Sequence, residues 1–241
     1  VSANSIQAPE WRESVANLVD AGVGAIKVYL LSGMDSFRDL DAAALREMLG
    51  HTHRLGVPVG VHAEDRAIVD ELTARAHLHG EDSPAAYAAS RPAAAETAAV
   101  ATCIEACRAT GARLHVVHLA SGEALDLLSA ARLEGLPISA ETCPHFLEFT
   151  DEDFDRLGSV LKTAPVVKGA DDRERLWQGL AGGELSFVAS DHAAGVWPDE
   201  KETGSIWSDY GGVPGVELLL PYLFDRGVRA GRLSLQRLTE V

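Results

Sequence analysis

The feature that most constrains this chain is a regular alternation of short, β-branched apolar runs with longer stretches of helical periodicity. The runs predicted to be strands cover residues 25–31, 58–63, 113–119, 137–143 and 185–191. The stretches predicted to be helices cover residues 41–55, 67–76, 93–110, 122–133, 172–180 and 216–223. Because strands that alternate with helices pair in parallel through right-handed crossovers, the pattern predicts an α/β fold with a parallel sheet.

Two α/β architectures have this order of elements, an open doubly wound sheet and a (β/α)8 barrel of the TIM type. Ionisable residues favour the barrel: His62, His118, Glu141 and Asp191 fall toward the C-terminal ends of predicted strands, and Lys27 lies within one. A barrel gathers such strand ends into one pocket. No Gly-x-Gly-x-x-Gly follows the first strand, which disfavours a dinucleotide-binding sheet. We therefore expect a partial barrel of five strands out of eight, with the others outside this sequence.

Length and composition narrow the class of protein. The 241 residues, 46% hydrophobic and without a linker or repeat, are interpreted as one domain over 1–241. A formal net charge of −15 without a basic cluster disfavours nucleic acid and anionic membranes as partners. No apolar run reaches about 18 residues, so no membrane span is predicted. Three cysteines without framework spacing indicate buried thiols and a reducing, cytoplasmic location.

The polar residues of the strands are candidate ligands for a divalent metal ion. His62 and His118 can each give a neutral imidazole nitrogen to zinc, and Asp191 can bind through one oxygen while the other accepts a proton. Lys27 differs, because an ammonium within an apolar strand carries a large desolvation cost. Its side chain is therefore a neutral amine, a Schiff-base nucleophile or a modified group. Carbamylation by carbon dioxide would make it an anion able to bridge two metals.

Six short runs occur in a characteristic order along the chain. They are Gly24-Ala-Ile-Lys27-Val-Tyr29, Val61-His-Ala-Glu-Asp65, Leu114-His-Val-Val-His118-Leu-Ala-Ser121, Glu141-Thr-Cys-Pro-His145, Ser190-Asp-His192 and Gly211-Gly-Val-Pro-Gly215. Together they resemble the cyclic amidohydrolase branch of the amidohydrolase superfamily, which includes allantoinases, hydantoinases (dihydropyrimidinases) and dihydroorotases. The resemblance extends from about Trp11 to the last residue.

The resemblance implies a catalytic centre with two divalent metal ions, zinc in the first instance. It implies that a carboxylated Lys27 bridges the two ions and that His62 and His118 bind the second one. Asp191 would bind the first ion and act as general base and then general acid, while a metal-bridging hydroxide attacks the carbonyl of a cyclic amide. The resemblance also assigns Ala164 and Gly211 to segments that face the substrate.

Other histidines and acidic residues receive structural interpretations. Glu141 is interpreted as an outer partner of a metal ligand, and His145 as a hydrogen-bonded residue near the site. His115 is expected to face the helix layer. The family also places a His-x-His pair before the bridging lysine; His51 and His53 have that spacing but follow Lys27 in a helical stretch, so they are interpreted as solvated helix residues. This chain is thus expected to hold part of a binuclear site.

Short motifs favour one substrate class over the others by a small margin. Tyr87-Ala-Ala-Ser-Arg-Pro92, Cys143-Pro-His145 and Tyr210-Gly-Gly-Val213 resemble allantoinases, whereas Gly212-Val-Pro-Gly-Val-Glu217 resembles hydantoinases or dihydroorotases. Allantoinase ranks first, hydantoinase second and dihydroorotase third. A metal-free scaffold homologue is the non-enzymatic alternative, disfavoured by the retained ligands. The implied partners are a small cyclic amide and further copies of the chain, as a dimer or tetramer.

Overall fold

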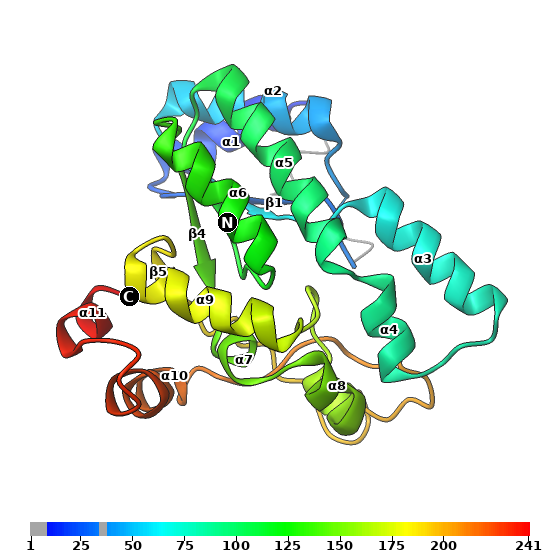
Figure 1. Cartoon of the computed structure of the whole chain (residues 1–241). Coiled ribbons are helices and arrows are strands. Elements are labelled where there is room, and N and C mark those ends of the chain that lie inside the picture. The colour runs from blue at the N-terminus through cyan, green and yellow to red at the C-terminus, as the bar shows by residue number, and fades with distance from the viewer. Residues whose placement is uncertain (1–8, 34–37) are drawn as a thin grey trace.

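The computed structural model describes residues 9–33 and 38–241, in which five parallel strands form one sheet (Figure 1). The strands are β1 (Ile26–Tyr29), β2 (Val59–His62), β3 (Leu114–Val116), β4 (Ile138–Thr142) and β5 (Phe187–Val188). Each strand pairs with the next one in the sequence, with Ile26, Val59, Leu114 and Ile138 in one row. All five predicted strands are confirmed, with shorter bounds.

Helices connect and flank the strands. They are α1 (Trp11–Asp20), α2 (Ala42–Leu55), α3 (Arg66–Leu78), α4 (Pro84–Ser90), α5 (Ala93–Thr110), α6 (Gly122–Leu133), α7 (Pro144–Glu148), α8 (Asp151–Leu157), the 3-10 helix η2 (Gly158–Leu161), α9 (Ala170–Gly182), α10 (Leu219–Tyr222), the π-helical segment η3 (Leu223–Arg229) and α11 (Leu235–Glu240). The helix predicted over 216–223 begins only at Leu219, because a turn closed by the Leu218 amide on the Gly215 carbonyl, 3.1 Å away, precedes it. No helix of the described residues combines the length and apolar composition that a bilayer crossing requires.

Local capping residues explain where the central helices begin and end. The Asp41 carboxylate accepts a hydrogen bond from the Ala44 amide at the start of α2, and Gly56 ends that helix with φ 73°. The Ser121 hydroxyl caps α6 by accepting from the Ala124 amide at 3.2 Å. Such signals are local in sequence, and the predicted bounds of these helices agree closely with the observed ones.

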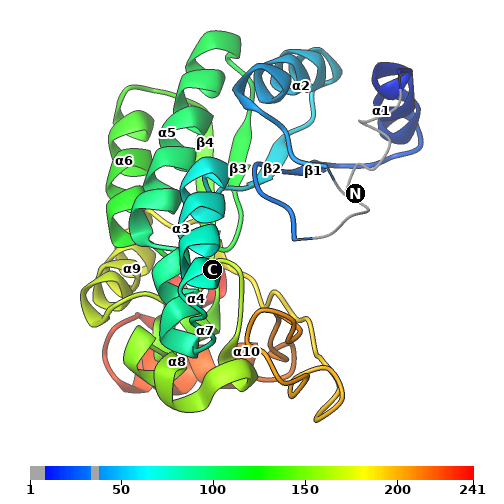
Figure 2. The ribbon, with the colours of Figure 1, turned by 90° about the vertical axis from the view of Figure 1, so that its right-hand side faces the viewer.

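Helices α2, α5, α6 and α9 form a continuous layer on one face of the sheet (Figures 1 and 2). Alternate strand residues such as Val28, Val61 and Val116 point into this layer and are at most 3% exposed. Where α9 packs on α6, a Cβ at Gly179 would lie 2.4 Å from Cδ2 of the buried Leu125, so any larger residue there would have to displace that side chain. A doubly wound sheet reverses its strand order and carries helices on both faces. Sequential order with one helix layer is the arrangement of a partial (β/α)8 barrel, as predicted.

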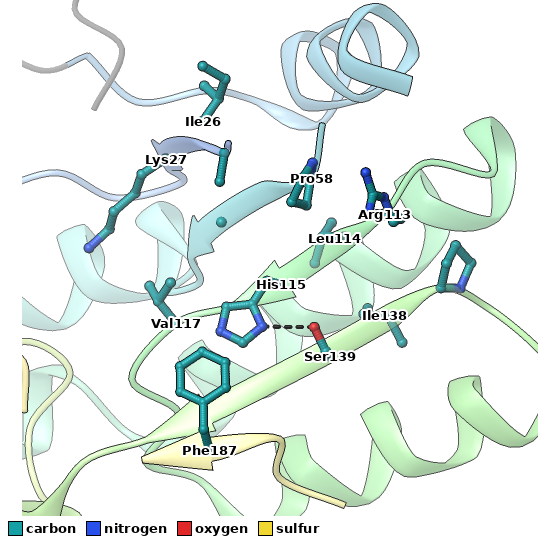
Figure 3. Close-up of a pocket in the computed structure, with 13 residues that line it drawn as sticks. Ile26, Lys27, Pro58, Arg113, Leu114, His115, Val117, Ile138, Ser139 and Phe187 are labelled. Atoms are coloured by element: carbon teal, nitrogen blue, oxygen red, sulfur yellow. Dashed lines mark hydrogen bonds between the residues drawn. The ribbon is translucent and has the colours of Figure 1, made fainter. Parts of the chain in front are cut away.

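The opposite, concave face of the sheet is open and carries the other set of alternate side chains. Lys27, Gly60, His115 and Ser139 form one row across four strands and line a hollow of about 600 Å³ (Figure 3). The prediction that His115 faces the helix layer is wrong. Its strand neighbours Leu114 and Val116 are buried against the helices, and strand alternation therefore turns His115 to the concave side.

Candidate metal centre

Two of the predicted ligands, His62 and His118, meet at the C-terminal ends of neighbouring strands. His62 is the last residue of β2, and His118 lies two residues beyond β3. Nδ1 of His62 is 3.1 Å from Nε2 of His118, and the two residues are 5% and 4% exposed. Two nitrogens bound to one tetrahedral zinc ion at about 2.0–2.1 Å are roughly 3.3 Å apart. The pair therefore has the separation that a shared metal ion requires.

The backbone of two predicted ligands is in an unusual conformation. His118 and Asp191 both have φ 43°, and they are the two non-glycine residues with positive φ in the described part of the chain. This left-handed conformation costs a non-glycine residue on the order of 1–3 kcal/mol, and such residues cluster at functional sites. Both residues follow the end of a strand, where the turn directs their side chains.

The protonation state of His118 suits metal binding. Burial first, and then the neighbouring positive charges of His62 and Lys27, hold the pKa of His118 well below its usual range. The His118 ring is therefore neutral near pH 7, and a neutral imidazole is the form that binds a metal ion.

A buried ion pair between Glu64 and Arg91 contacts His62 at Nε2, the ring nitrogen that does not face His118. Nε2 of His62 lies 2.8 Å from Oε2 of Glu64, and the Arg91 guanidinium donates to the same oxygen at 2.5 Å. Although burial alone would raise the pKa of Glu64, the Arg91 guanidinium beside it holds that pKa well below its usual range. A carboxylate behind a ligand histidine fixes the ring orientation and raises its basicity. The sequence interpretation missed both residues; a Glu two positions after the strand-end histidine was the available signal.

Lys27 lies beside the pair without touching it. It is half-buried in β1, and Figure 3 shows its side chain extending toward the C-terminal ends of the strands. Its Nζ is 5.1 Å from the centre of the Tyr29 ring, which is 5.7 Å from the centre of the His62 ring. No hydrogen bond or ion pair joins Lys27 to either histidine in the described residues.

Asp191 is exposed beyond the end of β5. Burial, with the nearby Asp191 and Glu141 carboxylates, raises the pKa of the Cys143 thiol well above its usual range, and Lys27 acts on it in the opposite sense. These charges therefore surround the end of β4. Over residues 9–33 and 38–241, however, no three His, Cys, Asp or Glu side chains lie close enough together to form a complete metal site. The described chain thus brings together His62 and His118 and leaves Lys27 and Asp191 apart from them.

His51 and His53 do not form a ligand pair. Both lie in α2, as predicted, away from the strand ends. His51 is partly buried rather than solvated, because its Nε2 is 2.9 Å from the Arg12 carbonyl and its ring packs edge-on against Trp11 at 5.3 Å.

The two segments assigned to the substrate side are joined to each other. The segment that contains Ala164 also contains Lys162, whose carbonyl accepts from the Gly212 amide at 2.8 Å, directly after Gly211. The buried Lys201 ammonium donates to the Gly212 carbonyl at 2.6 Å. Gly212 has φ 155°, and a Cβ there would lie 2.5 Å from the Ala193 carbonyl oxygen. Only glycine fits this contact.

Two structural interpretations need correction. Glu141 was expected to support a metal ligand, but its carboxylate lies 3.1 Å from Nε2 of His115, because both side chains occupy the concave face. His145 was expected to be hydrogen-bonded. Its Nε2 is buried without a partner among the described residues, and its ring packs on Phe146 at 4.2 Å. Burial lowers the pKa of His145 to about 4.

Several known proteins are similar to this chain in sequence or in fold. An allantoinase from Rubrobacter xylanophilus is 38% identical over 225 residues, covering 93% of this chain and 49% of that protein. An allantoinase from Enterococcus faecalis is 33% identical over 95% of this chain and 51% of its own length. The solved structure of an L-hydantoinase (dihydropyrimidinase) from Arthrobacter aurescens superposes with a TM-score of 0.92 and 31% identity, over 97% of this chain and 52% of that one.

The similarity is to part of each relative. This chain spans about half the length of the curated relatives it matches. A scan against protein-family models gave no match.

Proposed function

This chain belongs to the cyclic amidohydrolase family, and we propose that residues 1–241 form the central and C-terminal part of a catalytic barrel that hydrolyses a cyclic amide. The observation that carries the proposal is the His62–His118 pair, with facing nitrogens 3.1 Å apart, a neutral His118 and the buried Glu64 behind His62. A structural histidine pair would not require a strained backbone or a buried supporting ion pair.

We propose that His62, His118, Lys27 and Asp191 hold two divalent ions, zinc in the first instance, with Lys27 carbamylated. The donor set supports this, because two imidazoles already have the separation of ligands on one ion. An unmodified Lys27 ammonium would repel metal ions at a few ångströms, whereas a carbamate offers two anionic oxygens. Bound ions would polarise the amide carbonyl and bring the pKa of a bound water near 7.

The remaining chemistry belongs to residues of this chain. Asp191 is exposed at the strand ends, so its carboxylate can accept a proton from the attacking water and return it to the amide nitrogen as the C–N bond breaks. Glu64 and Arg91 keep the His62 ring in place. The joined segments containing Ala164 and Gly211 would bound the substrate on one side.

Allantoin is the substrate that we propose first. Its support is the allantoinase name carried by relatives 33–38% identical to this chain and the allantoinase-like runs 87–92 and 210–213. The solved structures of similar fold are named hydantoinase or dihydropyrimidinase, which makes those rings the second choice and dihydroorotate the third.

The test is a substrate panel on the complete protein, purified with zinc and assayed for metal content by mass spectrometry. We expect about two metal equivalents and the highest kcat/KM for allantoin. A higher kcat/KM for hydantoin, dihydrouracil or dihydroorotate would reassign the substrate within the family. Far less than one metal equivalent, with no ring opened, would identify a scaffold homologue instead. Light scattering on the same sample would test the proposed dimer or tetramer.

A further inference from the structure

A second buried carboxylate, Glu96, lies behind the His118 side of the pair. Glu96 is on α5 and is 1% exposed. Its Oε1 accepts hydrogen bonds from the backbone amides of Ala120 and Ser121, both at 2.8 Å. These amides follow His118 by two and three residues, and Ser121 caps α6. One carboxylate oxygen therefore binds the turn that leads from His118 into the next helix.

This turn is where the His118 backbone is strained. A non-glycine residue at φ 43° keeps that conformation only when its surroundings determine it strongly. The intervening Leu119 is held from the other side, because its amide donates to the Glu141 carbonyl and its carbonyl accepts from the Thr142 hydroxyl, both at 2.8 Å. Glu96 supplies the contacts on the helix side of the same turn.

Burial raises the pKa of Glu96 to about 7, and Lys168 and the two backbone amides act on it in the opposite sense. Lys168, which is 9% exposed, interacts electrostatically with Glu96 and with Glu64. Its Nζ donates to the Arg91 carbonyl at 2.6 Å. A buried carboxylate without a nearby cation would be costly. Glu96 on the His118 side and Glu64 on the His62 side therefore share the positive charge of Lys168.

We propose that Glu96 is a positioning residue: by binding the amides of Ala120 and Ser121, it holds His118 in the left-handed conformation that directs Nε2 at the metal ion shared with His62. The proposal rests on the proposed function for the presence of that ion. It assigns Glu96 no contact with substrate or metal. Its effect is on the affinity and geometry of the His62–His118 metal position.

The test uses the complete protein, stripped of metal and titrated with Co²⁺, with affinity measured by chelator competition and geometry by visible absorption. Glu96→Ala removes both acceptor contacts, and we expect Co²⁺ to bind about 10–100-fold more weakly, with an altered spectrum. Glu96→Gln keeps an oxygen that can accept both hydrogen bonds, so it should retain most of the affinity and the wild-type spectrum. Glu105→Ala, an exposed Glu on the same helix, is the matched control and should change neither.

Glu96→Asp makes the test independent of whether the alanine variant folds. It keeps a carboxyl group but withdraws the oxygen by one methylene, so we expect weaker Co²⁺ binding than in Glu96→Gln. Wild-type affinity and spectrum in folded Glu96→Ala or Glu96→Asp would overturn the proposal, as would a loss in Glu96→Gln equal to that in Glu96→Asp. A complete protein that binds Co²⁺ but opens no cyclic amide would refute the proposed function alone. One that binds no Co²⁺ would refute both.

Discussion

Two histidine–glutamate pairs in this molecule have the same chemistry and different surroundings. His62 and Glu64 are 2.8 Å apart, with side chains 7% and 1% exposed. His115 and Glu141 are 3.1 Å apart, with side chains 17% and 13% exposed, on the concave face of the same sheet. In the first pair, Arg91 contacts Glu64, and His118 faces His62. The second pair has a serine and the stacked Phe187 ring as neighbours (Figure 3).

The difference shows that the same two residue types can be buried to different degrees and have different neighbours in one sheet. In the buried pair, Arg91 keeps Glu64 ionised where water does not compete, so the hydrogen bond can hold the His62 ring in one orientation. In the more open pair, solvent has access to both partners and no second histidine faces His115. The proposed metal position therefore includes His62 of the first pair, with Glu64 behind it, and neither residue of the second pair.

The largest expected effect tests whether the buried pair belongs to a binuclear centre at all. Lys27→Ala should remove most of the bound metal and lower kcat/KM on the order of 10³-fold or more, beyond the 10–100-fold typical of an outer partner of a ligand. A short-chain carboxylic acid added to this variant should restore part of both, by standing in for the carbamate. Lys27→Arg should not, because guanidinium stays cationic. Full metal content with near-normal hydrolysis in Lys27→Ala would remove the bridge from the mechanism.

The second prediction concerns stability and the charge behind the buried pair. Arg91→Met leaves Glu64 buried without its cation, so the free energy of unfolding should fall by about 3–5 kcal/mol. Arg229→Met is the matched control; Arg229 pairs with Asp225 at the surface, where the side chains are 70% and 54% exposed. There the loss should be below about 1 kcal/mol. Equal losses in denaturant titrations would show that burial does not distinguish the two ion pairs.

His145 is a third buried histidine, and burial lowers its pKa with no carboxylate contributing. Burial lowers the pKa of His145 to about 4 from 6.5. Between these pH values the unfolded chain binds a proton that the folded one does not, so stability should fall as pH falls, by about 3 kcal/mol across the window. His145→Phe should flatten this dependence, whereas His53→Phe on the exposed face of α2 should leave it intact. An unchanged pH profile in His145→Phe would exclude His145 as the titrating group.

The smallest expected effect is on metal affinity, and it compares the Glu64 and Glu141 carboxylates directly. Glu64→Gln should weaken metal binding about 10–100-fold, because the amide cannot hold His62 as an anion does. Glu141→Gln should weaken it less than about tenfold, since Glu141 contacts His115 instead of a ligand. The readout is metal affinity by chelator competition in the complete protein. Similar losses of metal affinity in the two variants would show that the two histidine–glutamate pairs do not differ in function.

The amino-acid sequence by itself determined the order of elements and the identity of the candidate ligands. Alternating periodicity predicted all five strands and the five long helices that correspond to α2, α3, α5, α6 and α9, because this signal acts over a few neighbouring residues. The polar residues at strand ends identified His62 and His118, which the fold then brought into contact. That step was predictable, because parallel strands deliver their C-terminal ends to one edge.

Only the tertiary structure decided which charges are buried and what they support. Arg91 is 27 residues from Glu64, and Glu96 is 24 residues from the Ala120 amide that it binds. In the sequence, Glu96 is one acidic residue in an alanine-rich helix, and its burial depends on α5 packing against the turn beyond β3. The orientation of His115 was likewise decided by the sheet face that the helices cover. Burial and partnership of a charged group depend on residues distant in the chain, and no local pattern encodes them.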